Sequence, residues 1–269
     1  MKFLTQPIIS IRDNWVLLWQ FTMRDLAIEH KGSFLGSVWL IGQPLLLMSV
    51  YTFVFSQIYN GRYGVVEHET SIHYAIGIFI GITILHLFND TLNGSVQCII
   101  GNPNFVKKVV FPLEVIPLSI VLKSLYKFSI SFLLIFLSIF LLLRNIPSNI
   151  IWFPAIIIPS VLFSSGISWL ISAVGVYFRD ISPLIQISSL CMLWLSAIFY
   201  SARDLPPAAW QILKYNPVLL NIEMSRDILL WGTAPNLVWL AYTNIVSLCV
   251  FFIGFWFFRK LKPTFADVL

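Results

Sequence analysis

One apolar stretch of the chain carries polar side chains at a regular spacing. They recur three or four positions apart, as residues on one face of a helix do, and they are His86, Asn89, Asp90 and Asn93. A carboxylate near the middle of a lipid bilayer costs several kcal/mol unless it is paired or hydrated. This face is therefore expected to line a polar path for a hydrophilic substrate or to form hydrogen bonds with a neighbouring helix.

Two lysines stand four positions apart in the next apolar stretch and form a second candidate site. Lys123 and Lys127 could attract the phosphate or pyrophosphate of a lipid on the cytoplasmic side, or extend their ammonium groups to the lipid headgroups. A rise of about 1.5 Å per residue puts Lys123 about 8 Å past the start of its stretch, within reach of the headgroups. Headgroup contact is thus favoured for Lys123, while both interpretations stay open for Lys127.

Groups that would perform catalysis or bind a metal are not recognisable in the sequence. It contains no GxxxxGK[ST], HExxH, GxSxG or CxxC motif. Its cysteines, Cys98, Cys191 and Cys249, have no histidine partner at a metal-binding spacing. We expect no catalytic residue, metal or cofactor in this chain. If it carries out active transport, the energy comes from another chain or from an ion gradient.

The polar residues are embedded in apolar stretches that are long enough to cross a bilayer, since about 20 helical residues span the hydrocarbon core. The chain is 58% hydrophobic and only 11% charged, whereas about a quarter of the residues of a soluble domain are charged. We predict an all-α integral membrane protein. Its six transmembrane helices are expected near residues 35–59, 72–100, 118–143, 150–177, 184–200 and 237–258.

The distribution of basic residues predicts the orientation in the membrane. If the N-terminus is cytoplasmic, ten lysines and arginines lie inside and five lie outside, which satisfies the positive-inside rule. Both termini are then cytoplasmic, because the number of spans is even. This topology accounts for the net charge of +5, so no nucleic acid partner is expected.

The segment before the first span is predicted to be an amphipathic helix along the inner membrane surface. It covers residues 14–31 between Asp13 and Gly32, and its apolar face carries Trp15, Leu18, Trp19 and Leu26. We therefore divide the chain into an interface segment, residues 1–34, and a transmembrane domain, residues 35–269. The helix could be a platform for a cytoplasmic partner or a simple membrane anchor.

Two connections between spans are long enough to carry structure of their own. Prolines bracket residues 104–111, which could form a short helix that docks on a partner or an ordinary positively charged loop. On the outside, residues 201–235 have room for two short helices, the first started by the prolines at 206 and 207 and the second covering 219–231 before Gly232. Their Leu and Trp content predicts shallow immersion in the outer leaflet, as a gate over an exit or as an inert cap.

Several segments form a recognisable series along nearly the whole chain. They are RDLAIEHKGSFLGSVWLIGQPLLLMSVYTFVF from Arg24, NPNFVKKVVFPLEVIPLS from Asn102, GVYFRDI from Gly175, IFYSARDLP from Ile198 and the final FFRKLKPTFADVL. In this order they resemble the polysaccharide-exporting permeases of type-2 ABC transporters. That family includes exporters of O-antigen, capsule and teichoic acid.

The resemblance implies a homodimer in a bacterial inner membrane that exports a lipid-linked polysaccharide to the periplasm, together with two copies of a separate ATPase subunit that binds ATP and Mg²⁺. It implies that the interface helix and the short cytoplasmic helix dock on the ATPase, through Arg24, Glu29, Lys31, Asn104, Phe105, Lys107 and Lys108. It also implies that the outer helices gate the exit, with the gate residues Trp210, Tyr215, Asn216 and Arg226. No family motif assigns a role to Asp90, Lys123 or Lys127.

Aromatic residues complete the expected substrate path, because rings and neutral polar groups can hold a sugar polymer weakly enough for it to slide. Tyr51, Phe55 and Tyr59 recur every four residues in the first span, and the fifth span carries Trp194, Phe199 and Tyr200. We predict that these rings line the channel together with the polar stripe, although such stripes are also common in cores. Capsule or teichoic acid export, drug efflux and an intramembrane enzyme acting on lipid-linked sugars are the alternatives.

Overall fold

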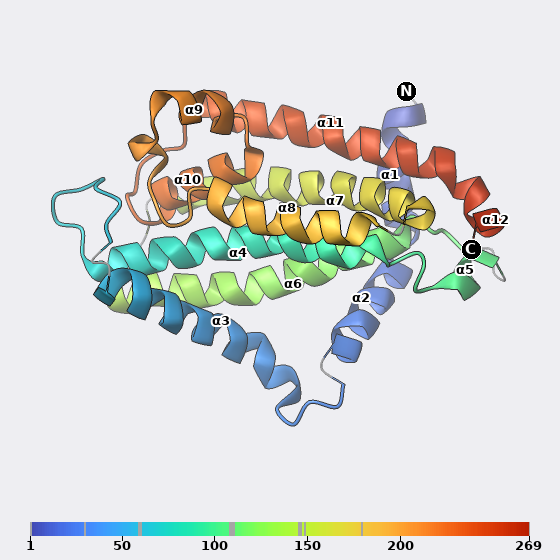
Figure 1. Ribbon diagram of the computed structural model, residues 1–269, viewed down its shortest axis with the longest axis horizontal. Coiled ribbons are helices and arrows are strands. Elements are labelled where there is room, and N and C mark those ends of the chain that lie inside the picture. The colour runs from blue at the N-terminus through green and yellow to red at the C-terminus, as the bar shows by residue number, and fades with distance from the viewer. Residues whose placement is uncertain are drawn as a thin grey trace.

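The computed structural model describes residues 2–29, 31–58, 61–107, 111–144, 147, 149–178 and 180–268. All regular structure in these residues is helical (Figure 1). The α-helices are α1 (Lys2–Asp13), α2 (Trp15–Glu29), α3 (Trp39–Tyr51), α4 (Ser71–Val96), α5 (Pro103–Lys107), α6 (Val115–Ser138), α7 (Phe153–Tyr177), α8 (Ile181–Leu195), α9 (Pro207–Leu213), α10 (Pro217–Leu229), α11 (Leu237–Leu261) and α12 (Phe265–Val268). The predicted all-α fold is confirmed.

Five helical segments of the described chain are long and apolar enough to cross a membrane. They are Gly36–Phe55, Ser71–Val96, Val115–Leu143, Ile150–Tyr177 and Leu237–Val268. The first combines α3 with a short 3-10 turn before it and the π-helical turn η2 (Thr52–Ile58) after it. The third continues α6 into a second π-helical turn, η3 (Ile139–Leu143).

The predicted fifth span corresponds to α8, which is shorter than expected. Its 15 residues reach about 22 Å, less than the hydrocarbon thickness of about 30 Å. The prediction that the helix continues to Tyr200 is wrong, because α8 ends at Leu195 and Ala197 adopts a left-handed φ of 51°. The chain therefore turns before Phe199 and Tyr200.

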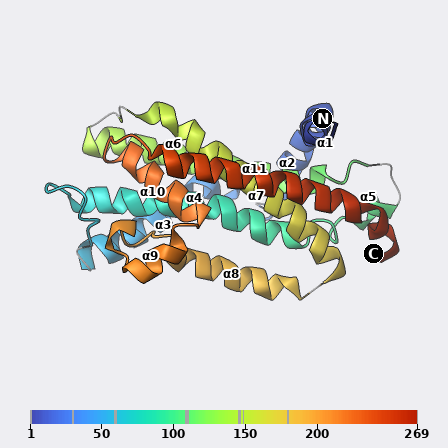
Figure 2. The same ribbon diagram turned by 90° about the horizontal axis from the view of Figure 1, so that it is seen from above.

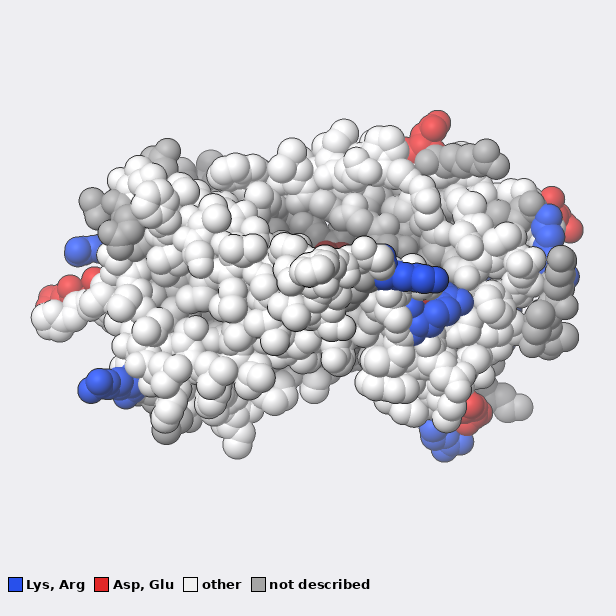
Figure 3. Space-filling model, turned by 90° about the horizontal axis from the view of Figure 1, so that it is seen from below, with Lys and Arg blue, Asp and Glu red and all other residues white. Residues whose placement is uncertain are grey.

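The long helices lie side by side in a bundle whose long axis is horizontal in Figure 1. α1, α5 and α12 lie at one end, which we call the α5 end, while α9 lies at the opposite end, the α9 end. Figure 2 shows that α11 runs alongside α7 and that α8 lies at the edge of the bundle. The face in Figure 3 is mostly uncharged along its length, as expected of a surface in contact with lipid tails.

α7 and α11 approach so closely that their backbones touch. A side-chain carbon placed at Gly166 would meet the Val250 carbonyl, and one at Gly254 would meet the Gly166 carbonyl. Glycine at both positions is therefore what permits this packing, as small residues do between membrane helices. Nearby, the buried Trp169 donates from Nε1 to the main-chain oxygen of Glu114, 3.1 Å away, and so joins α7 to the start of α6.

α4 is buried inside this bundle, whereas α3 lies at its surface. Most residues of α4 are buried between α6, α7, α8 and α10, whereas none of the described residues of α3 is buried. In Figure 1 the C-terminal end of α3 meets the bundle near the α9 end and its N-terminal end diverges from it. Residues from the first half of α3, from α4 and from α6 line a cavity between these helices, and we call this place the wedge.

A helix, α2, covers Trp15–Glu29 within the segment predicted as the interface helix, but its apolar residues differ in burial. Leu18 and Leu26 are buried, while Trp15 and Trp19 are 51% and 46% exposed. The four positions still fall within about 100° of one another around α2, as predicted for one helical face, so their burial differs along the helix. Hydropathy does not predict which of these apolar residues are buried, because burial depends on which parts of α2 pack against other helices, chiefly α6.

Candidate functional site

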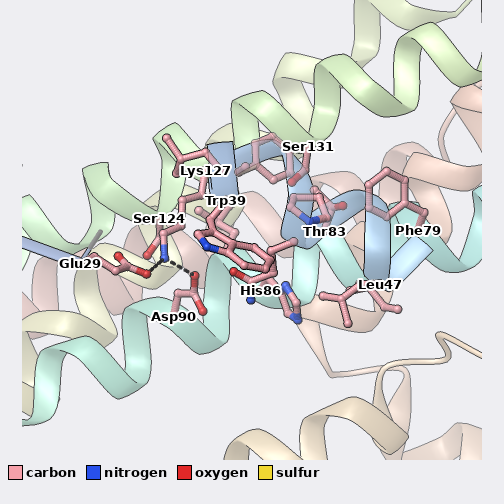
Figure 4. A pocket seen from close by; sticks show the side chains of 16 residues that line it. Glu29, Trp39, Leu47, Phe79, Thr83, His86, Asp90, Ser124, Lys127 and Ser131 are labelled. Atoms are coloured by element: carbon pink, nitrogen blue, oxygen red, sulfur yellow. Dashed lines mark hydrogen bonds and ion pairs between the residues drawn. The ribbon is translucent and has the colours of Figure 1, made fainter. Parts of the chain in front are cut away.

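A polar cavity of about 270 Å³ lies in the wedge between α3, α4 and α6, beside the end of α2. Figure 4 shows how the side chains from these helices converge on it. The polar and aromatic residues that line it include Glu29, Trp39, Gln43, Thr83, His86, Asp90, Ser124, Lys127 and Ser131. Predicted docking, channel and phosphate residues thus meet in one place.

An ion-pair cluster closes one side of this wedge pocket. Lys127 Nζ lies 2.5 Å from Glu29 Oε1 and 3.6 Å from Asp90 Oδ2, so α6 is joined to α2 and to α4. Lys123 Nζ lies 3.4 Å from the other oxygen of Glu29. Two ammonium groups thus face two carboxylates. The predicted phosphate contact of the lysines stays a prediction, but both already have carboxylate partners.

The charge state of Glu29 follows from these contacts. Burial raises its pKa, but the hydrogen bond from Lys127 and the positive charge of Lys123 outweigh burial and hold the pKa below its usual value of 4.5. Glu29 is therefore ionised at neutral pH. Because the paired side chains remain partly exposed, each pair is expected to contribute only about 0–1 kcal/mol to stability.

The polar stripe of α4 divides between two neighbours. Asn89 Nδ2 donates to the main-chain oxygen of Ser189 at 3.3 Å, and Asn93 Nδ2 donates to its hydroxyl at 3.1 Å. The interpretation as hydrogen bonds between helices therefore holds for these two residues. His86 and Asp90 instead line the wedge pocket, and their role in a substrate path stays a prediction.

Thr83 contributes a hydroxyl that the sequence analysis missed. Its side chain lines the pocket and is only 4% exposed, yet its Oγ1 has no hydrogen-bond partner within the part of the chain that the structure describes. A buried hydroxyl without a partner costs about 1–3 kcal/mol. The position one helical turn before His86 could have indicated a pocket residue, but a threonine in an apolar run also suits a core.

The predicted channel aromatics form one cluster near the other end of α3. The ring centroids of Phe55 and Phe199 are 4.4 Å apart, and Tyr51 and Trp194 lie 5.7 and 5.6 Å from Phe199. Tyr200 donates from its hydroxyl to the main-chain oxygen of Trp194 at 2.7 Å. The structure thus joins rings from α3, η2, α8 and the turn after it, while Tyr59 lies outside the described residues.

Arg226, a predicted gate residue, is the most deeply buried cation described, with 2% of its side chain exposed. It pairs with Glu223 Oε1 at 3.1 Å, and its guanidinium carbon lies 4.3 Å from the Tyr63 ring centre. The guanidinium also donates at 2.7–3.1 Å to the main-chain oxygens of Gly77, Ala197 and Ile198. Arg226 therefore fixes α10 to the start of α4 and to the strained turn after α8.

Comparison with known proteins places these features in a family. Residues 16–230 match the model of the ABC-2 type transporter family. The chain belongs to the ABC-2 type transporter family. It is similar to the O-antigen export system permease protein RfbA of Klebsiella pneumoniae, with 28% identity over 94% of this chain and 95% of that protein. It is also similar to the RfbA protein of Myxococcus xanthus, with 25% identity over 93% of this chain and 94% of that protein. It is also 24% identical to the polysialic acid transport protein KpsM of Escherichia coli, over 88% of this chain and 90% of that protein.

The expected docking residues of this ABC-2 chain differ in what they contact. Arg24 pairs with its neighbour Asp25 at 2.8 Å, and Glu29 belongs to the wedge pocket. Phe105 of α5 packs against Phe21 of α2, with ring centroids 5.2 Å apart. Lys31, Asn104 and Lys107 are exposed, while Lys108 lies outside the described residues. Docking on an ATPase stays a prediction for all of them.

The short helix of that loop, α5, covers Pro103–Lys107 and so includes only part of the predicted 104–111. Phe111, the expected last residue, lies beyond it and packs against Phe105 with ring centroids 4.8 Å apart. α5 is therefore held on α2 through aromatic rings, which leaves its polar residues at the α5 end of this ABC-2 subunit.

The two helices expected to act as a gate, α9 and α10, also differ from each other. α10 is mostly buried, packing against α4 and α7, so the prediction that it rests shallowly in the outer leaflet is wrong. Asn216 begins α10 by accepting at Oδ1 from the Val218 and Leu219 amides. Trp210 packs on Trp239 with centroids 6.2 Å apart, while Tyr215 is 55% exposed.

Proposed function

We propose that this ABC-2 chain is the membrane-spanning subunit of a transporter that exports lipid-linked O-antigen polysaccharide from the cytoplasm to the periplasm. The observation that carries the proposal is the similarity to O-antigen export permeases over 94% of the chain, a length that includes the wedge pocket and the aromatic cluster. An aromatic surface and neutral polar groups suit a chain of hydroxylated rings.

The proposed subunit works as a homodimer with two copies of a separate ATPase, which bind the ATP and Mg²⁺. The α5 end then faces the cytoplasm, where exposed Lys31, Asn104 and Lys107 are available to the ATPase. The α9 end faces the periplasm, and both termini are cytoplasmic. Apolar faces of α3 and α8 that are exposed in a single subunit, including Leu45 and Leu190, are covered by lipid or by the second copy.

Removal of the protein from its native cell tests this function. We expect lipid-linked polysaccharide to accumulate on the cytoplasmic side of the inner membrane, while lipid A and core sugars still mature. Re-expression of the chain should restore surface O-antigen. Unchanged surface glycan in the deletion strain would contradict polysaccharide export and favour drug efflux.

Capsular polysaccharide is the second candidate substrate, because the polysialic acid transport protein of Escherichia coli is also similar over 88% of this chain. The same deletion distinguishes the two. Loss of capsule with intact O-antigen would assign capsule export. Loss of O-antigen alone supports the main proposal.

The aromatic cluster can be tested separately by Tyr51→Ala. This change removes a ring that contacts Phe55 and Phe199, so we expect slower export from a normally assembled complex. Phe53→Ala is the matched control, because Phe53 lies two residues away and is 62% exposed. Equal export rates in the two variants, measured by pulse-labelling of surface glycan, would remove Tyr51 from the path.

A further inference from the structure

Three buried hydroxyls in the described part of the chain have no hydrogen-bond partner, those of Thr83, Ser196 and Ser247, and of these residues Thr83 lines the wedge pocket. Buried threonines elsewhere in the described helices donate to their own helix, as Thr22 does to Leu18 and Thr91 does to Leu87, both at 2.8 Å. Thr83 is just as buried, but its Oγ1 has no partner among the described residues. Buried hydroxyls are nearly always hydrogen-bonded. The Thr83 oxygen is itself enclosed, so rotation of this pocket-lining side chain toward the cavity is expected to let an entering group complete the bond.

The charges around the pocket indicate which kind of group that is. Both ammonium groups, of Lys123 and Lys127, are paired with the carboxylates of Glu29 and Asp90, so this cluster has no net formal charge. A phosphate would have to approach two carboxylates and separate existing ion pairs. A neutral molecule with hydroxyl groups can instead donate to the carboxylates and accept from the ammonium groups without separating them.

The remaining lining residues match the two chemical faces of a sugar. Trp39 offers an indole ring and a ring N–H, Gln43 offers an amide, and His86 and Ser131 add further donors and acceptors. The cavity of about 270 Å³ is slightly smaller than the roughly 300–1,000 Å³ of sites for drug-sized ligands. It is therefore suited to one ring rather than to a length of polymer.

We propose that the wedge pocket binds one uncharged sugar ring of the exported glycan. The indole of Trp39 packs against the C–H face of the ring, and the Thr83 hydroxyl bonds to a ring hydroxyl. The inference rests on the proposed function, but it adds a site on the flank of each subunit. This site lies beside the first half of α3, whereas the aromatic cluster lies at its far end.

Two threonine variants on one helix provide the main test. Thr83→Val removes the unpartnered hydroxyl with little change in volume, and Thr91→Val removes a hydroxyl that only bonds to its own helix. We expect Thr83→Val to lower the rate of glycan export by about threefold to tenfold, the range for loss of one neutral hydrogen bond. Thr91→Val should export normally, and Thr83→Ser should retain most of the wild-type rate.

Thermal stability separates binding from folding in the same variants. If Thr83 were only a core residue, valine would remove an unsatisfied group, so the purified complex would be as stable or more stable and export would be unchanged. We expect the same or higher melting temperature together with slower export. Wild-type export by Thr83→Val at a normal membrane level would overturn the proposal.

Occupancy can be measured directly with a cysteine at Ser131 in the full complex. Cys191 and Cys249 are exposed and are first replaced by serine, while Cys98 is buried and stays. N-ethylmaleimide should label Ser131→Cys at least about threefold more slowly in membranes from cells that make the glycan than from cells unable to begin its synthesis, as expected when the occupied state dominates. Thr83→Val should remove this protection.

Each outcome of the labelling has one meaning. Equal labelling rates in the two kinds of membrane overturn the sugar site. Both rates would be slow if a lipid fills the pocket and fast if the pocket is empty. The proposed function fails instead if the deletion strain keeps its surface glycan. A deletion strain that loses the glycan, combined with equal labelling, therefore rejects the pocket and retains the export function.

Discussion

Two cations join helices to opposite parts of α4, and they do so with different partners. Arg226 is 2% exposed and bonds to main-chain oxygens, including that of Gly77 near the start of α4. Lys127 is 26% exposed and bonds to two side-chain carboxylates, including that of Asp90 near the end of α4. Main-chain carbonyls are not protonated and move only with the backbone, whereas carboxylate side chains can exchange partners.

The different partners of Arg226 and Lys127 predict different roles for their surroundings. The Arg226 centre is a fixed structural element, because removal of one member leaves buried polar groups without partners. The Lys127 cluster is partly exposed and lies beside a cavity, so its contacts can rearrange at a small free-energy cost. Rigid structure is thus expected near the α9 end of α4 and adjustable structure around the wedge pocket.

Arg226→Lys should have the largest effect on stability. Lysine keeps the charge but cannot make the forked contacts with Ala197, Ile198 and Gly77, so we expect a loss of about 1–3 kcal/mol for each main-chain oxygen left without a partner. The measurements are the membrane level and the thermal unfolding of the detergent-purified complex. A melting temperature equal to that of the wild type would show that the centre is not fixed by these bonds.

Lys127→Gln should destabilise the protein less, by about 1 kcal/mol. It leaves the Asp90 carboxylate without its ammonium partner, although Lys123 still faces Glu29. Adding Asp90→Asn should recover most of the loss, and a double-mutant cycle measures the coupling. A loss as large as that of Arg226→Lys would break the proposed contrast.

The smallest effects should come from two carboxylates whose responses to pH have opposite signs. The Lys127 and Lys123 contacts outweigh the effect of burial on Glu29 and lower its pKa below 4.5. Its ion pairs therefore stabilise the fold at neutral pH, and the contribution is lost as the pH falls through the lowered pKa. Burial and the Glu223 charge raise the pKa of Asp227 above 3.8, so its ionisation disfavours the fold until the pH falls through that raised value.

Glu29→Gln should accordingly lower the melting temperature at pH 7, and Asp227→Asn should raise it, each by an amount equivalent to about 0.5 kcal/mol. Both differences should shrink below the usual carboxylate pKa values. Melting curves between pH 7 and the acid limit of the complex measure the two trends. A shift of the same sign for both variants at pH 7 would contradict the assigned charge states.

The sequence predicted local features well, because hydropathy and spacing depend on neighbouring residues. Five spans, the helix before them and the proximity of Tyr51 to Phe55 were predictable in this way. The pairing of Lys127 with Glu29 was not, since 98 positions separate them. The burial of α10 was missed because apolar side chains suit lipid and protein surroundings equally.

The end of α8 was missed for a different reason. The sequence after Leu195 is still apolar, so periodicity predicted a continuing helix, but Ala197 takes a left-handed conformation that alanine rarely adopts. The Arg226 bonds to Ala197 and Ile198 stabilise that turn. Only the folded chain shows that the arginine and the turn depend on each other.

The glycine contact between α7 and α11 has a consequence for how movement in the subunit can be observed. Because the backbones touch at Gly166 and Gly254, the two helices can neither slide nor roll past one another without a clash. They form an internal reference frame against which displacements of α3 or α8 can be measured. Spin labels placed on α7 and α11 should keep one separation through every nucleotide state, while a label on α3 reports how far the wedge opens.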